Sequence, residues 1–285
     1  MSFSKNIIIL SFPRSGSSLM ANLIASAGYK HYISERSELM GGSEFNPDGY
    51  FEDTLITLLN DQLIRFYFGK KCSFLYLPKI NNKPPNNPLL WNYDIDETTL
   101  FLPKDYEKNI KQYTGHDWDV WGLTRMVEGQ KWFRCYSRLG VQDFFGIFKQ
   151  KKIFEDKFNS STNLVLKDPR LSLTLPFYNL KNYRIIYIKR DKDDILSSMR
   201  KHYGPNLFNG IFLPKSQYCS NHFNYKIEYQ DFDEYCEIFS SNITYALSTK
   251  NHLTVNYNKI LSKDEDTIDM INNFIHGEIN INLIK

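Results

Sequence analysis

Short apolar runs alternate along this chain with longer stretches in which apolar residues recur every three or four positions. The short runs are typical of buried strands, and the periodic stretches are typical of amphipathic helices. Strands are predicted at residues 7–10, 164–166, 183–188 and 253–257, and helices at 16–27, 54–68, 140–158, 192–202, 231–248 and 264–275. Because the elements come in β–α order, we expect an α/β fold with a mostly parallel sheet flanked by helices on both faces.

Residues 70–130 break this pattern. The prolines that interrupt the segment are Pro78, Pro84, Pro85, Pro88 and Pro103, and it also holds Trp91, Trp118 and Trp121. An irregular segment of this length is unusual as scaffold. We therefore expect one α/β domain over residues 1–285, in which 70–130 is an insertion or cap beside the functional site. The tryptophans either pack a small core or stack on a sugar or planar ligand.

Composition narrows the classes of function. Hydrophobic residues make up 42% of the chain and charged residues 24%, as in ordinary globular proteins, and the net charge of +3 is too small to indicate a nucleic-acid partner. No apolar run reaches about 18 residues, so no membrane span is expected. The N-terminus lacks the form of a signal peptide. Neither the histidines nor the four cysteines show disulfide or metal-ligand spacing, which favours a cytoplasmic protein without a metal site.

The residues between the first strand and the first helix favour an anion site. A strand end, a tight loop and a helix N-terminus make backbone N–H groups converge, and the helix dipole favours negative charge there. Gly16 permits close backbone approach, and further donors come from Arg14, Ser15, Ser17 and Ser18. The loop has the length of a nucleoside-triphosphatase P-loop, but Ser11 replaces its first glycine and Ser17 its lysine, which argues against ATP hydrolysis. A plain strand-to-helix turn is the alternative.

A second candidate anion site follows the strand at 183–188. Arg190 lies at the carboxyl end of that strand, Asp191 can cap the next helix, and Ser198 lies two turns into it. Ligands of open α/β sheets bind at the carboxyl ends of the strands. Two such ends with anion-binding groups predict a ligand with two separated phosphate groups, although a solvated helix start would also explain Arg190 and Ser198.

Taken in order, these segments resemble those of sulfotransferases that use 3′-phosphoadenosine-5′-phosphosulfate (PAPS). Phe12 to Ser18 resembles their 5′-phosphosulfate loop, and Arg190 to Ser198 their 3′-phosphate motif. Asn46 to Glu52 (Asn-Pro-Asp-Gly-Tyr-Phe-Glu) and Lys167 to Arg170 (Lys-Asp-Pro-Arg) resemble segments of the bacterial-type branch. Two departures are Arg14, where many cytosolic members have lysine, and the lack of a clear C-terminal Arg-Lys-Gly segment, which many of them use on the 3′-phosphate.

The resemblance implies a P-loop-like fold and a reaction. Its cofactor is PAPS, bound by Pro13, Arg14, Ser15, Gly16, Ser17, Ser18, Arg190 and Ser198. The sulfuryl group passes in line to a hydroxyl or amine of a small-molecule or saccharide acceptor, and the segment 70–130 faces the acceptor. Two rivals remain open at this point: a P-loop kinase or other nucleotide phosphotransferase, and a non-catalytic nucleotide-binding protein.

The chemistry needs three catalytic parts. Arg14 suits the leaving phosphate, and Lys167 suits the sulfuryl oxygens, a role that the resemblance implies. Glu52 is the expected base, although a carboxylate at a helix start would satisfy the same pattern. Weaker candidates for the base are His31, Glu35, Glu44 and Asp168; for Asp168, an ion pair that orients Lys167 or Arg170 is the stronger expectation.

Overall fold

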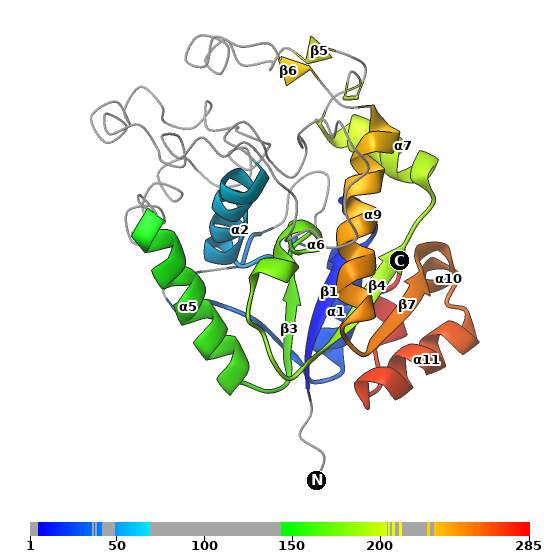
Figure 1. The fold of residues 1–285 in the computed structure, drawn as a ribbon. Helices are drawn as coiled ribbons and strands as arrows, with labels where there is room; N and C mark the ends of the chain where they lie inside the picture. The colour runs from blue at the N-terminus through cyan, green and yellow to red at the C-terminus, as the bar shows by residue number, and fades with distance from the viewer. Residues whose placement is uncertain are drawn as a thin grey trace.

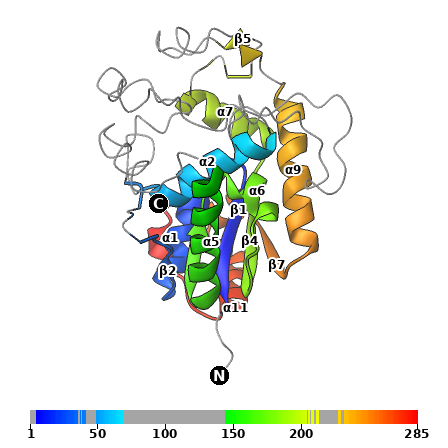
Figure 2. The same ribbon diagram turned by 60° about the vertical axis from the view of Figure 1, so that its left-hand side comes forward.

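The computed structural model describes residues 5–35, 37, 39–41, 49–68, 144–203, 205, 207, 208, 211, 212, 227, 228 and 231–285. Within these ranges, a sheet of five parallel strands runs through the centre in the order β2-β3-β1-β4-β7 (Figures 1 and 2). Its strands are β1 (Asn6–Ser11), β2 (Lys30–His31), β3 (Leu164–Lys167), β4 (Tyr183–Lys189) and β7 (His252–Asn256). The prediction of an α/β fold with a mostly parallel sheet is confirmed.

Helices cover both faces of the sheet. One face is packed by α1 (Ser17–Ser26), α10 (Tyr257–Leu261) and α11 (Glu265–Ile275). The other is packed by α2 (Thr54–Phe68), α5 (Phe144–Ser160), α6 (Leu171–Thr174), η3 (Leu175–Phe177) and α9 (Phe232–Ser248), as Figures 1 and 2 show. In β1, Ile7 and Ile9 pack into the core on the face covered by α1 and α11, whereas Ile8 and Leu10 pack into the core on the face covered by α2 and α5. A strand buried on both faces has no polar alternation, which explains the unbroken apolar run.

The connections after β1 and β4 leave the sheet toward opposite faces. The chain leaves β1 for α1, whereas it leaves β4 for α7 (Lys192–Tyr203), where Ile195 and Met199 join the core that holds α9. The two strands are hydrogen-bonded neighbours, with Ser11 opposite Ile188. Adjacent parallel strands whose connections diverge leave a crevice at their carboxyl ends, where ligands bind in open α/β sheets.

The remaining elements are short. They are β5 (Ile211–Phe212) and β6 (Ile227–Glu228), which form an antiparallel pair, and η4 (Ile281–Leu283). No described helix has both the length and the apolar character that a bilayer crossing requires.

The longer predicted elements are present near their predicted bounds, whereas β2, α6, η3 and α10 were not predicted. Tyr257 was predicted to end a strand but begins α10, because the side chain of Asn256 accepts a hydrogen bond from Asn258 N (2.8 Å) and caps a helix there. The prolines and tryptophans of the predicted insertion lie outside the described residues, and the single-domain extent stays a prediction.

Candidate active site

The loop after β1 turns sharply into α1. Arg14 has a φ of 67° and Gly16 a φ of 85°, so the chain makes two left-handed steps before α1 begins. Gly16 is the N-cap of α1 and no side-chain hydrogen bond caps the helix there. The Ser15 hydroxyl is buried and has no hydrogen-bond partner among the described residues. Uncapped helical N–H groups and a buried unpaired hydroxyl suit an anion.

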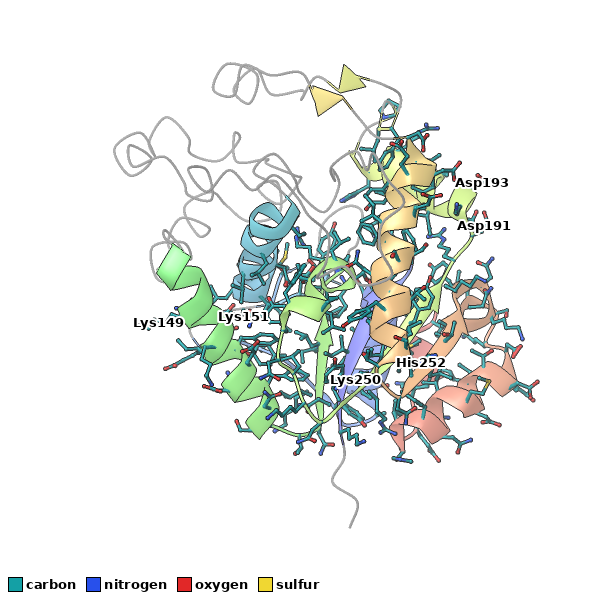
Figure 3. The ribbon with its side chains drawn as sticks, viewed as in Figure 1. Lys149, Lys151, Asp191, Asp193, Lys250 and His252 are labelled. Carbon is teal, nitrogen blue, oxygen red and sulfur yellow. The ribbon has the colours of Figure 1, made fainter. Side chains whose placement is uncertain are left out.

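The two predicted phosphate-binding segments are in contact. Arg190 Nη1 donates a hydrogen bond to Arg14 O (2.6 Å), and Arg14 Nε donates to Ser198 Oγ at 3.5 Å. These residues come from the ends of two neighbouring strands and from α7, which begins beside them. At the start of that helix, Asp191 Oδ1 accepts from Asp193 N (2.9 Å), the cap that the sequence predicted (Figure 3).

Tyr257 is part of this site and was missed from the sequence. It follows β7 directly, and its ring lies against Gly16 so closely that a Cβ at that position would overlap it. The Arg190 guanidinium lies over the same ring, with Cζ 4.6 Å from its centroid, which is a cation–π contact. The signal that could have found Tyr257 is its position at the carboxyl end of the last predicted strand of a parallel sheet, where ligand-binding residues collect.

Lys167 and Glu52 form a buried ion pair beside the first loop. Lys167 ends β3 next to Ile9 of β1, and its Nζ donates to Glu52 Oε1 and to Tyr50 O (3.1 Å). Ser18 Oγ donates to the same carbonyl at 3.3 Å. The segment from residue 50 to 52 therefore joins the start of α1 to the end of β3. Asn46, Pro47 and Asp48 of the same motif lie outside the described residues.

A second ion pair extends this cluster. Arg170 Nη1 lies 3.6 Å from Glu52 Oε2 and donates to Asp168 Oδ1 at 3.0 Å, and all four charged residues are buried. Asp168 thus orients Arg170, as expected. Two carboxylates face two cations, so the cluster is neutral overall. Burial raises the pKa of Glu52, and the neighbouring Lys167 opposes that shift.

The other candidate bases lie elsewhere. His31 ends β2 with its ring stacked on Phe51 at 4.9 Å, and burial lowers its pKa. Glu35 is exposed in the turn after β2, and Glu44 lies outside the described residues. In the part of the chain that the structure describes, no cluster of histidine, cysteine and acidic residues is placed to hold a metal ion.

Two sulfotransferase domains match this chain in structure. One comes from the curacin biosynthetic pathway, with 12% identity over 97% of this chain and 75% of that domain and a TM-score of 0.42. The other comes from the Synechococcus PCC 7002 olefin synthase, with 10% identity over 99% and 77% and a TM-score of 0.40. No family model matches the sequence, and no curated protein does. The matches are loose, so the function depends on the residues of this chain.

Proposed function

We propose that this protein transfers a sulfuryl group from PAPS to a hydroxyl or amine of a small-molecule or saccharide acceptor. The observation that carries the proposal is the contact between the loops after β1 and β4, where Arg190 donates to Arg14 O. Two segments that we propose to bind anions, 176 residues apart in the sequence, are thus in contact at neighbouring strand ends. A nucleotide with phosphate groups at both its 3′ and 5′ positions fits such a crevice better than a nucleotide with one phosphate chain.

The residues present fit the donor. The buried Ser15 hydroxyl and the uncapped start of α1 suit the 5′-phosphosulfate, and Arg190 with Ser198 suits the 3′-phosphate. The proposed donor-binding residues are Pro13, Arg14, Ser15, Gly16, Ser17, Ser18, Arg190 and Ser198. Ser17 stands where a P-loop kinase has its lysine, so this site lacks the group that such enzymes use on the β- and γ-phosphates.

The proposed chemistry is an in-line displacement at sulfur. The bond from sulfur to the phosphate oxygen breaks while a bond from sulfur to the acceptor oxygen or nitrogen forms, and the acceptor proton must leave. Arg14 neutralises the leaving phosphate, Lys167 holds the sulfuryl oxygens, and Glu52 takes the proton. Burial raises the pKa of Glu52, which makes its carboxylate a stronger proton acceptor than an exposed one.

Thermal unfolding with nucleotides tests the donor. We expect 3′,5′-bisphosphoadenosine to raise the melting temperature without magnesium, since a ligand at 100 times its Kd stabilises the folded state by about 2.7 kcal/mol. Adenosine 5′-phosphate, which lacks the 3′-phosphate, is the matched control and should do less at the same concentration. A larger shift with magnesium and ATP would favour a phosphotransferase instead.

Transfer itself is tested with radiolabelled PAPS and pools of hydroxyl- and amine-bearing acceptors. We expect label to move to an acceptor in the presence of the protein and not in its absence. Binding of the bisphosphate without transfer to any acceptor pool would favour a non-catalytic nucleotide-binding protein.

A further inference from the structure

A buried polar chain continues from the ion cluster into α2. Asn60 lies on that helix with its side chain fully buried. Its Nδ2 donates to Asp168 Oδ2 at 2.9 Å, and its Oδ1 accepts from Thr174 Oγ1 and from the Tyr178 hydroxyl, each at 2.7 Å. Both the nitrogen and the oxygen of this buried amide therefore have hydrogen-bond partners.

The partners fix which way the amide points. The Asp168 carboxylate can only accept, so the NH₂ group must face it, and the amide oxygen then faces the hydroxyl groups of Thr174 and Tyr178. Asp168 then accepts from Asn60 on one oxygen and from the backbone and side chain of Arg170 on the other. A carboxylate, which only accepts, suits three donors. In this state it holds Arg170 toward Glu52, whose second oxygen lies 3.6 Å from Arg170 Nη1.

We propose that Asn60 is a positioning residue of the sulfuryl-transfer site: by donating to Asp168 it keeps Arg170 against Glu52, and so orients the base for the acceptor proton. This inference rests on the proposed function and deepens it. Among the described residues, the Asn60 side chain bonds to Asp168, Thr174 and Tyr178, and none of these is assigned to the donor or the acceptor. It acts through Asp168 and Arg170, as the outer partners of metal ligands act through the ligands that they orient.

Asn60→Asp is the sharpest test, because the side chain keeps its shape and its acceptor for Thr174 and Tyr178 but has no donor for Asp168 when it is ionised. Two carboxyl oxygens then face each other where the amide and Asp168 now lie 2.9 Å apart, and the pair must share a proton. A carboxyl group that binds its proton more tightly when folded stabilises the fold at low pH and loses that contribution as the pH rises. The variant should therefore approach the wild type in stability near pH 4.5 and fall behind it at pH 8.

The kinetic readout separates positioning from a merely structural role. We expect Asn60→Asp to lower kcat by about ten- to a hundredfold while the Kd for 3′,5′-bisphosphoadenosine changes by less than about threefold. This loss should be largest near pH 8 and smaller at lower pH, since a proton shared by the two carboxyl groups restores a donor to Asp168. The groups that face Glu52 are Lys167, Asp168 and Arg170, and all three are kept.

Ile271→Ala is the control for lost stability. Ile271 is fully buried on α11 against the opposite face of the sheet, so its truncation destabilises the fold without touching the cluster. At a pH where Ile271→Ala and Asn60→Asp are equally destabilised, Ile271→Ala should keep the kcat of the wild type. Its pH profile should also match that of the wild type. Equal losses of kcat in the two variants would overturn the positioning role, and so would an Asn60→Asp variant with the wild-type kcat.

The stability comparison also keeps this inference distinguishable from the proposed function. It needs no substrate, so it decides whether the amide faces Asp168 even if no acceptor is found. If the relative stability of Asn60→Asp does not depend on pH, the arrangement described here is wrong. If it does, but the wild type neither binds the bisphosphate nor transfers sulfate, the proposed function fails and the catalytic role of Asn60 fails with it.

Discussion

Replacement of Gly16 by alanine is the perturbation whose cost the structure specifies best. Gly16 has a φ of 85°, and an added Cβ would overlap the Tyr257 ring. The left-handed backbone costs an L-residue about 1–2 kcal/mol, and forcing an atom into a packed contact adds about 1–3 kcal/mol. We therefore expect Gly16→Ala to lower the free energy of unfolding by about 2–5 kcal/mol.

Gly28 is a matched control in the same helix–loop unit. Its φ is 97°, but nothing lies within 4 Å of the Cβ that alanine would add. Gly28→Ala should therefore show the backbone cost alone, about 1–2 kcal/mol. Urea unfolding followed by circular dichroism gives both values, and at an unchanged m-value a shift of the midpoint reports stability.

A double variant isolates the contact itself. In a Tyr257→Ala background the overlap is gone, so the added cost of Gly16→Ala should fall to that of Gly28→Ala. Equal costs for Gly16→Ala and Gly28→Ala in the otherwise unchanged protein would refute the reasoning, since they would mean that the Tyr257 ring does not lie on the loop.

Three further predictions concern single groups. Arg190→Ala should weaken 3′,5′-bisphosphoadenosine by about ten- to a hundredfold and adenosine 5′-phosphate much less in calorimetry; equal losses would remove its 3′-phosphate role. Turnover should fall as the pH drops through the raised pKa of Glu52. Glu52→Gln should abolish this fall at low pH and lower kcat by about 10²–10⁴. A kcat for Glu52→Gln within about threefold of the wild type would exclude Glu52 as the base. Burial raises the pKa of Cys236 to about 12, so its thiol should be alkylated far more slowly at pH 8 in native than in unfolded protein, as measured on the peptide that contains it. Equal rates would contradict its burial.

The sequence predicts the sheet well because its strands are buried on both faces. Such strands leave an unbroken apolar run, as in residues 7–10, and they also fix where the carboxyl ends lie. The convergence of Arg14 with Arg190 followed from that geometry, since neighbouring strand ends bring their loops together. Lys167 was placed by the same reasoning, and Glu52 by the motif that precedes α2.

The missed residues depend on contacts that no local pattern carries. Asn60 reads as an ordinary polar position within a helix, and its burial arises from Thr174 and Tyr178, which lie 114 and 118 residues later. Tyr257 reads as the last residue of an apolar strand, whereas the Asn256 cap turns the chain into α10 and lays the ring over Gly16. Both errors concern side chains whose neighbours come from distant parts of the chain.

The central position of β1 has a consequence for biosynthesis. This strand is made before both of its neighbours in the sheet, which lie far later in the chain; Ser11 N, for example, binds the Ser172 hydroxyl 161 residues away. Pairing over such separations is slow, and unpaired apolar strands are prone to aggregate while they wait. An emerging chain must therefore carry this apolar strand unpaired until β3 and β4 have been made, which exposes it to aggregation during that interval.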